Sequence, residues 1–168
     1  MSISMYSASV PVFVRQLGAI LNWLDKAEAH ATAKKFDTAV YLQSRLAPDM
    51  LPFIAQIRVA SDASKGCIAR LAGVEPPKFE DDETNFEELR QRVRKTIDYL
   101  NSVPADSIDG SEERDIVIPM RNRDPLSFKG EFYLKHWAMP NFMFHTAMTY
   151  ALLRHAGVDI GKRDFLNM

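Results

Sequence analysis

Apolar residues recur at intervals of three and four in four long segments, and this spacing constrains the fold more than any other feature of the chain. The segments span residues 10–34, 49–73, 84–103 and 140–157. Such spacing places the apolar side chains on one face of an α-helix. We therefore expect a mainly α-helical chain in which four helices bury these faces against one another as a four-helix bundle.

Capping residues and helix breakers set the expected boundaries of the helices. Asp49 is the expected N-cap of the second helix, and Gly73 suits the left-handed position that follows a helix C-terminus. Thr84 and Glu87 have the spacing of a capping box, in which each side chain bonds the free backbone N–H of the other. We therefore expect the third helix to begin at Thr84 and to end at Pro104.

Charged residues fill the remaining faces of the third segment, which predicts an amphipathic helix on the surface of the bundle. They are Glu87, Glu88, Arg90, Arg92, Arg94 and Lys95. The connector before this helix, residues 74–83, combines prolines with a run of acidic residues. We expect it to be a solvated loop and not a metal site, because consecutive acidic side chains do not converge on one point.

Between the third and fourth helices the pattern changes to β-branched and aromatic runs. Residues 116–118 and 128–134 flank the turn-rich stretch 121–125, which predicts a small two-stranded β-hairpin inserted before the last helix. An isolated hairpin is marginally stable in water, so we expect it to pack against the helices. His136 and Trp137 are then expected to cover the end of the bundle, with the mouth of a cleft as the alternative position.

The composition is that of one globular domain spanning residues 1–168, with 46% hydrophobic residues and a net charge of −1. The single cysteine, Cys67, excludes an intrachain disulfide and is expected to be a packed, inert thiol. Neither a phosphate-binding glycine loop nor a basic surface with interleaved aromatic residues is present, so we expect no nucleic-acid partner. Without a signal peptide or a long apolar run, we expect no membrane partner and a cytoplasmic location.

His145 is the histidine whose surroundings most resemble a site, because the fourth segment is apolar on nearly every side. Asn141 precedes it by one helical turn and Thr149 follows it by one, so the three side chains share a face. A buried neutral imidazole can bind a metal ion or shuttle a proton. The alternative is a core histidine bonded to a neighbouring helix, and this alternative is favoured for a histidine without a second ligand.

Several motifs along the chain resemble an uncharacterised family within the DinB/YfiT-like four-helix-bundle superfamily. They are residues 47–52 (Ala-Pro-Asp-Met-Leu-Pro), residues 61–66 (Ser-Asp-Ala-Ser-Lys-Gly), Leu134, residues 140–145 (Pro-Asn-Phe-Met-Phe-His) and the tail, residues 153–166. The resemblance implies an up-down-down-up bundle that assembles as a homodimer. It also implies a divalent metal, zinc or nickel, bound by one histidine of the second helix and a His-x-x-x-His pair on the fourth.

Carried over residue by residue, the implied metal site is incomplete. His145 matches the second histidine of the fourth-helix pair, whereas the first falls on Asn141, a far poorer ligand. The second helix has no histidine, and its nearest polar substitutes are Gln56 and Asp62. Asp62 lies one turn from Arg58, which favours an ordinary surface ion pair between these two residues.

Two functions follow from these residues. The first is a small-molecule-binding or assembly protein that retains a degenerate metal site, with His145, Asn141, Thr149, Gln56 and Asp62 as its candidate pocket. The alternative is a divalent-metal-dependent enzyme, of the thiol transferase or hydrolase type, that uses His145. Whether the chain is an enzyme stays open. The apolar fourth helix is also a candidate for the seam of the homodimer.

Overall fold

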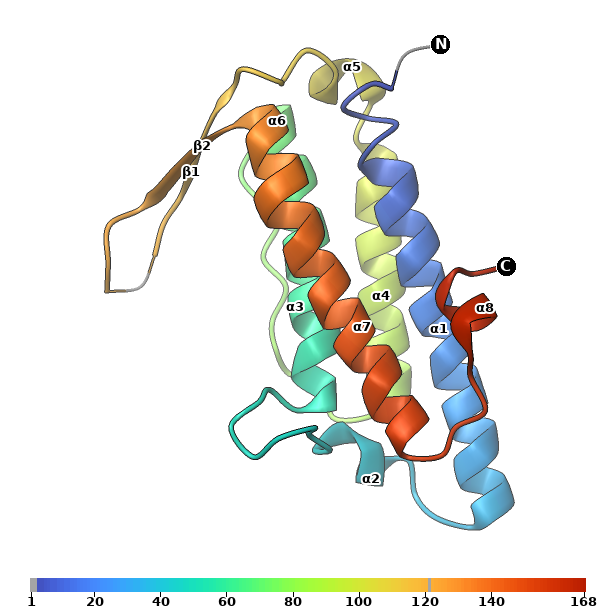
Figure 1. The fold of residues 1–168 in the computed structure, drawn as a ribbon. Helices are drawn as coiled ribbons and strands as arrows, with labels where there is room; N and C mark the ends of the chain where they lie inside the picture. Colours follow the sequence, from blue (N-terminus) through green and yellow to red (C-terminus); the bar gives the residue numbers. More distant parts are fainter. Residues whose placement is uncertain (1–2, 121) are drawn as a thin grey trace.

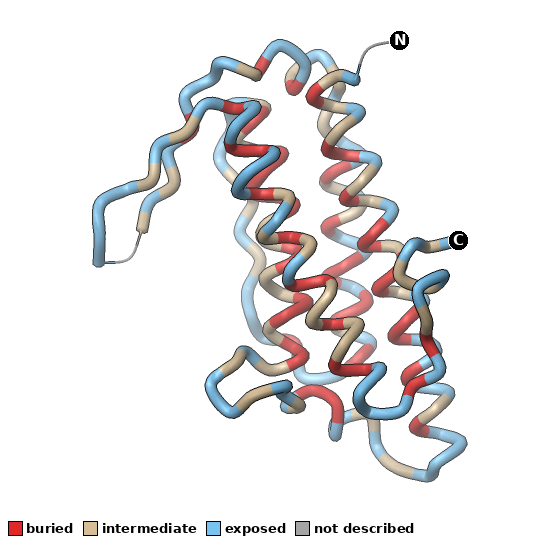
Figure 2. Tube along the Cα trace, in the orientation of Figure 1, coloured by how far each residue is buried: buried red, intermediate tan, exposed pale blue. Residues whose placement is uncertain are grey.

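Four long helices form a bundle in this computed structural model, which describes residues 3–120 and 122–168. They are α1 (Val10–Lys34), α3 (Phe53–Ala72), α4 (Phe86–Ser102) and α7 (Met139–His155). Figure 1 shows that α3 and α4 run in one direction and α1 and α7 in the other, which is the predicted up-down-down-up order. Buried residues lie on the sides where the helices face one another (Figure 2), so the predicted four-helix bundle is confirmed.

Shorter elements connect the long helices. They are α2 (Ala39–Leu42), α5 (Ala105–Ile108), β1 (Asp115–Ile118), β2 (Leu126–Lys129), α6 (Gly130–Tyr133) and α8 (Lys162–Phe165). Strands β1 and β2 pair antiparallel, with Ile116 opposite Phe128, and this confirms the predicted hairpin. The hairpin extends away from the end of the bundle in Figure 1.

The second strand ends at Lys129 and does not continue to Leu134 as predicted. Helical backbone begins at Gly130, where the chain passes very close to the neighbouring segment. A Cβ atom at this position would lie 2.0 Å from the carbonyl oxygen of Ser111, so only glycine fits there. The chain passes close to Ser111 at Gly130 and then enters the bundle. The aromatic run that follows is helical and not part of the strand.

Helix α7 begins at Met139, which confirms the predicted start near Pro140, but other helical elements directly precede it. Helix α6 joins α7 through a π-turn at Leu134–Ala138, so helical backbone runs without interruption from Gly130 to His155. In a regular α-helix the ring of Pro140 would clash with the carbonyl group of His136. The wider π-turn lies where this clash would fall and accommodates the proline inside the helix. Pro140 consequently lies in the first turn of α7, directly after the π-turn.

Helix α3 begins at Phe53, after an extended Pro52, and the predicted N-cap at Asp49 is wrong. Leu51 precedes a proline, and a residue in that position is disfavoured in helical backbone. The predicted end is confirmed, since Gly73 follows the helix with φ of 74°. Within α3, Cys67 is fully buried and burial raises the pKa of its thiol, as expected for a packed and inert cysteine.

The predicted capping box of α4 is displaced by one residue. Asn85 is the N-cap, and its side-chain oxygen accepts from the backbone N–H of Glu88 at 3.0 Å. The Glu88 carboxylate reaches back to the backbone N–H of Thr84 at 2.5 Å. The pair Thr84 and Glu87 therefore does not cap the helix, because Asn85 stands one residue nearer and supplies the stronger cap.

The C-terminal tail packs against α1. Nε1 of Trp23 donates to the carbonyl oxygen of Asp164 at 3.1 Å, and the ring of Phe165 stacks on Trp23 with centroids 5.7 Å apart. The tail thus covers the side of the bundle that lies opposite the hairpin (Figure 1).

No helix in the described part of the chain has the length and apolar character needed to cross a bilayer.

Candidate functional site

His145 and Gln56 meet across the contact between α7 and α3, the most extensive helix pair in the bundle. Nδ1 of His145 lies 2.7 Å from Oε1 of Gln56. The amide nitrogen of Gln56 donates to the carbonyl oxygen of Leu51 at 2.9 Å, so the amide oxygen faces the ring and accepts a hydrogen bond from Nδ1–H. Burial lowers the pKa of His145, which keeps the imidazole neutral at neutral pH. This is the geometry of a core histidine bonded to a neighbouring helix.

Thr149 and Asn141 do not join His145 in one polar site. Thr149 is buried, and its hydroxyl donates to the carbonyl oxygen of His145 at 2.9 Å, within the same helix. Asn141 is half-buried and lines a separate pocket together with Asp62. The three residues thus share a helical face as predicted, but their polar groups are directed to different neighbours.

Asp62 belongs to an ion network, and the predicted pair with Arg58 is wrong. Its Oδ1 lies 2.8 Å from Nζ of Lys65 and 3.0 Å from Nη2 of Arg92. Arg58 instead pairs with Glu83 at 2.7 Å. The spacing on α3 did not reveal this, because Arg92 and Glu83 lie outside that helix and Lys65 offers Asp62 a second basic partner one turn away.

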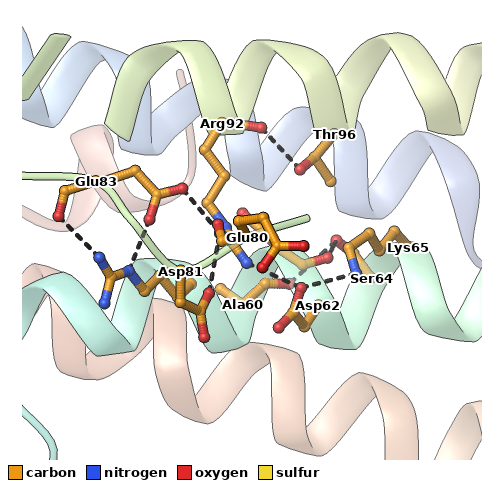
Figure 3. A network of polar contacts seen from close by, with 11 residues as sticks. Ala60, Asp62, Ser64, Lys65, Glu80, Asp81, Glu83, Arg92 and Thr96 are labelled. Carbon is orange, nitrogen blue, oxygen red and sulfur yellow. Dashed lines mark hydrogen bonds and ion pairs between the residues drawn. The ribbon is translucent and has the colours of Figure 1, made fainter. Parts of the chain in front are cut away.

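The ion network, shown in Figure 3, joins α3, α4 and the connector between them. Arg92 lies at its centre with a side chain only 2% exposed, and it pairs with Glu83 at 2.8 Å and with Asp81 at 3.0 Å. Burial by itself would raise the pKa of Glu83, but hydrogen bonds from Arg92 and Arg58 outweigh burial and hold the pKa below its usual value. The network therefore fastens the connector to the bundle.

The expectation that these charges are solvated is wrong for three residues. Glu83 and Arg92 are buried in the network, and Arg90 is buried against α1, where it pairs with Asp25 at 3.0 Å and Glu28 at 2.7 Å. Long arginine stems can cover apolar surface while their guanidinium groups pair with carboxylates. Helix α4 is consequently covered on more sides than its charge pattern predicts.

A pocket of about 280 Å³ opens between α3, the π-turn and the hairpin, and we call it the α3–α7 pocket. Its apolar walls include Val59, Ala63, Ile118, Trp137 and Ala138. Its polar lining consists of Asp62, Arg70, Tyr133 and Asn141. Trp137 therefore occupies the alternative position predicted for it, beside a cleft, and does not cover the end of the bundle.

Arg70 and Tyr133 place hydrogen-bond donors at one end of this pocket. Nη1 of Arg70 donates to Oη of Tyr133 at 3.3 Å, and the guanidinium has no carboxylate partner among residues 3–120 and 122–168. Burial raises the pKa of Tyr133 to about 12, so its hydroxyl keeps its proton at neutral pH. No sequence motif distinguishes either residue. The only signal is Gly66 in the middle of α3, where a Cβ atom would lie 2.6 Å from Nη1 of Arg70.

The residues expected to hold a divalent metal do not form a ligand set for zinc or nickel. The donors are one imidazole, His145, the amides of Asn141 and Gln56, and Asp62, whose Oδ1 is engaged in ion pairs. Catalytic zinc usually takes three nitrogen, sulfur or carboxylate ligands from the protein. In the described part of the chain, no three His, Cys, Asp or Glu side chains converge to hold an ion. The side chains present therefore do not fit the metal that the resemblance implies.

The helix order, the inserted hairpin and the contact between α3 and α7 define a DinB-like four-helix bundle. The chain is similar to the crystal structure of a DinB family member protein from Shewanella denitrificans, at 36% sequence identity and a TM-score of 0.88. That similarity covers 96% of this chain and 90% of the other. The chain belongs to the family described as a domain of unknown function, DUF1993, which matches residues 5–166. No curated protein matches it. The predicted membership of an uncharacterised DinB-like family is confirmed.

Proposed function

We propose that this chain is a small-molecule-binding protein whose site is the α3–α7 pocket. Polar groups with unused hydrogen-bonding capacity line this pocket, and this observation carries the proposal. The Arg70 guanidinium has no carboxylate partner, and the Asn141 amide makes no hydrogen bond to another described residue. Small-molecule sites typically combine apolar walls with a few placed polar groups of this kind.

The proposed site differs in position from the one that the sequence predicts. Asn141 and Asp62 line the pocket, whereas His145, Gln56 and Thr149 lie outside its lining. His145 and Gln56 bond each other across the contact between α3 and α7, and Thr149 bonds within α7. We propose that His145 is a remnant of a degenerate metal site, with a structural role in the present chain. The hydrogen bond between His145 and the side-chain amide of Gln56 supports this role, as does the burial of the ring.

Assembly as a homodimer and a cytoplasmic location also belong to the proposal. The outward side of α7 supports the dimer, because Phe144 is 50% exposed on a helix that carries no charged residue between Met139 and Leu153. The single buried cysteine is compatible with a reducing compartment. Binding in the pocket requires neither feature.

Blocking the pocket tests the proposed site directly. Ala63 is half-buried in the pocket wall, so Ala63→Leu fills the pocket, whereas Ala33→Leu adds the same side chain to an exposed position of α1. Binding of a small-molecule fragment library is followed by the NMR signals of two indole groups. Trp137 lines the pocket, and Trp23 is buried against the tail and is the internal control.

We expect fragments that shift the Trp137 signal and leave the Trp23 signal in place. Their affinity is expected to fall at least about tenfold in Ala63→Leu protein and to stay unchanged in Ala33→Leu protein. The proposal is overturned if no fragment shifts the Trp137 signal, or if Ala63→Leu protein binds as well as wild type.

Elemental analysis of protein purified without a metal-affinity tag tests the enzyme alternative. We expect no stoichiometric zinc or nickel, because the donor set around His145 does not fit either ion. A tightly held metal that is lost in His145→Ala protein, with the fold retained, would contradict this expectation and favour a metal-dependent enzyme.

A further inference from the structure

We infer that the α3–α7 pocket takes a small organic carboxylate, whose anionic group is bound by Arg70 and Tyr133. This inference rests on the proposed function of the pocket and names the chemical class of its ligand. It is carried by the position of one guanidinium, by the charges around the pocket and by the apolar walls.

Arg70 differs from the other arginines of α3 and α4 in its charge environment. Within the described residues, Arg58, Arg90, Arg92 and Arg94 each lie within ion-pair distance of a carboxylate. Arg70 is half-buried, yet its guanidinium bonds only the neutral hydroxyl of Tyr133. A partly desolvated guanidinium without a counter-charge is a receptor for an anion, and its planar fork of donors matches a carboxylate.

Gly66 leaves room for the Arg70 side chain in this position. Nη1, Cζ and Nη2 of Arg70 lie 2.6, 3.6 and 3.9 Å from the place that a Cβ atom of residue 66 would occupy. The guanidinium therefore folds back over the bare backbone of the preceding turn of α3. Glycine inside a helix is unfavourable relative to alanine, and the placement of Arg70 gives this glycine a structural reason.

Tyr133 supplies a second donor beside the guanidinium. Its Oη accepts from Arg70, and among the described residues its own O–H has no acceptor. Tyr133 is buried, with only 2% of the residue exposed, and it lines the pocket. One carboxylate can thus accept from both Arg70 and Tyr133.

The charges along the pocket favour a singly charged ligand. Arg70 is the one basic residue in the lining, and Asp62 lies at the other end. The eight residues from Asp62 to Arg70 correspond to about 12 Å along α3. A dianionic phosphate ester would meet a single cation in the lining, whereas a monocarboxylate needs no second cation. The charge pattern therefore favours a carboxylate over a phosphate.

The other lining residues indicate which chemical groups the rest of the ligand carries. Val59, Ile118 and Trp137 form apolar surface between the two polar ends. The amide of Asn141 can bond a neutral polar group toward the Asp62 end. A volume of about 280 Å³ is suited to a small molecule with a short apolar body and not to a polymer.

Titration with a panel of aliphatic and aromatic monocarboxylates tests the inference. Each acid is paired with its primary amide and with a phosphate monoester of the same body, and binding is followed by the Trp137 indole signal. Arg70→Gln removes the charge in the pocket, and Arg94→Gln removes an equivalent charge from the exposed side of α4. Gly66→Ala keeps the charge of Arg70 and displaces its guanidinium.

We expect carboxylates to bind more tightly than their amides. Arg70→Gln is expected to weaken carboxylate binding about 10- to 100-fold, as for loss of a hydrogen bond to a charged group, while Arg94→Gln leaves it unchanged. Gly66→Ala is expected to weaken carboxylate binding without lowering thermal stability, which separates a misplaced guanidinium from a damaged fold.

Three outcomes would overturn the inference, and they separate it from the proposed function. If amides bind as tightly as carboxylates and Arg70→Gln changes nothing, the pocket is a small-molecule site but the class of ligand is wrong. If phosphate monoesters bind more tightly through Arg70, the anion is a phosphate. If no panel member and no library fragment shifts the Trp137 signal, both the inference and the proposed function fail.

Discussion

The surroundings of His145 determine how this residue titrates. Its Nδ1 bonds the side chain of Gln56, and the ring of Phe144 meets it edge-on with centroids 5.1 Å apart. Burial lowers the pKa of the imidazole, so the unfolded chain, with a pKa of about 6.5, binds a proton more readily than the folded chain. The stability that His145 contributes is therefore present above the unfolded pKa and is lost as pH falls through the lower folded pKa.

We expect wild-type protein to lose more stability than His145→Gln protein when the pH falls from about 7.5 to about 5.5. Glutamine keeps a polar group near Gln56 but does not titrate. Urea unfolding of both proteins at the two pH values measures the difference. An equal loss in the two proteins would show that His145 is not held neutral by burial.

The spacing of residues predicted that His145 lies on a buried helix, but it could not predict what the ring meets. Gln56 lies 89 residues away, and it faces His145 only because α3 and α7 pack against each other. Arg70 of α3 and Tyr133 of α6 also meet only in the folded chain, and neither has a local motif. Pairings between distant side chains depend on packing, which a single sequence does not display.

Substitutions at the start of α4 distinguish Asn85 from Thr84 as the N-cap. We expect Asn85→Ala to destabilise the protein by about 1 kcal/mol, because the Asn85 side chain satisfies the free N–H of Glu88. Thr84→Ala is expected to cost less, since the Glu88 carboxylate still accepts from the backbone N–H of residue 84. Thermal unfolding of the two variants measures the difference. A larger loss for Thr84→Ala would instead support the capping box that the sequence predicts.

The buried side of α4 depends on Arg92. We expect Arg92→Ala to destabilise the protein by about 1.5–3 kcal/mol, because it breaks hydrogen bonds between charged groups, while Arg58 still pairs with Glu83 and Lys65 with Asp62. Arg94→Ala, two residues further along the helix, is expected to change stability by no more than about 0.5 kcal/mol, since this side chain is exposed. Urea unfolding measures both variants. Equal effects would contradict the central place of Arg92 in the ion network.

Helical periodicity predicted all four long helices, because an apolar stripe is a property of a contiguous segment. The boundaries were less predictable where a special backbone conformation decides them. Gly130 begins a helix because the Ser111 carbonyl leaves no room for a side chain, and Pro140 is accommodated by a π-turn. The burial of Arg92 was also hidden, since charged residues on a helix usually face solvent.

The arrangement of the whole molecule leaves an apolar side of α7 uncovered, and we expect a homodimer to form there. Phe144 on α7 is 50% exposed, and Phe132, near the hairpin, is 54% exposed. Because the two phenylalanines are similarly exposed, Phe132 is a suitable control position for Phe144. Sedimentation at micromolar concentration is expected to show a dimer for wild type and for Phe132→Lys, and a monomer for Phe144→Lys. A monomeric wild type, or a dimer that persists in Phe144→Lys, would contradict this seam.

The up-down-down-up order of the helices was available from the resemblance to the DinB-like superfamily and not from the helical pattern alone. Short connections favour antiparallel neighbours. Here α3 and α4 run parallel because the long connector between them returns along the bundle, where the ion network fastens it. The pocket is lined by residues of α3, the hairpin, α6, the π-turn and α7.

The most direct measurement is a crystal structure of wild-type protein grown with the tightest-binding monocarboxylate of the panel. We expect electron density for the ligand in the α3–α7 pocket, with its carboxylate on Arg70 and Tyr133 and its body against Trp137. An empty pocket at a saturating concentration, a ligand bound elsewhere, or a metal ion on His145 would contradict the proposed binding site.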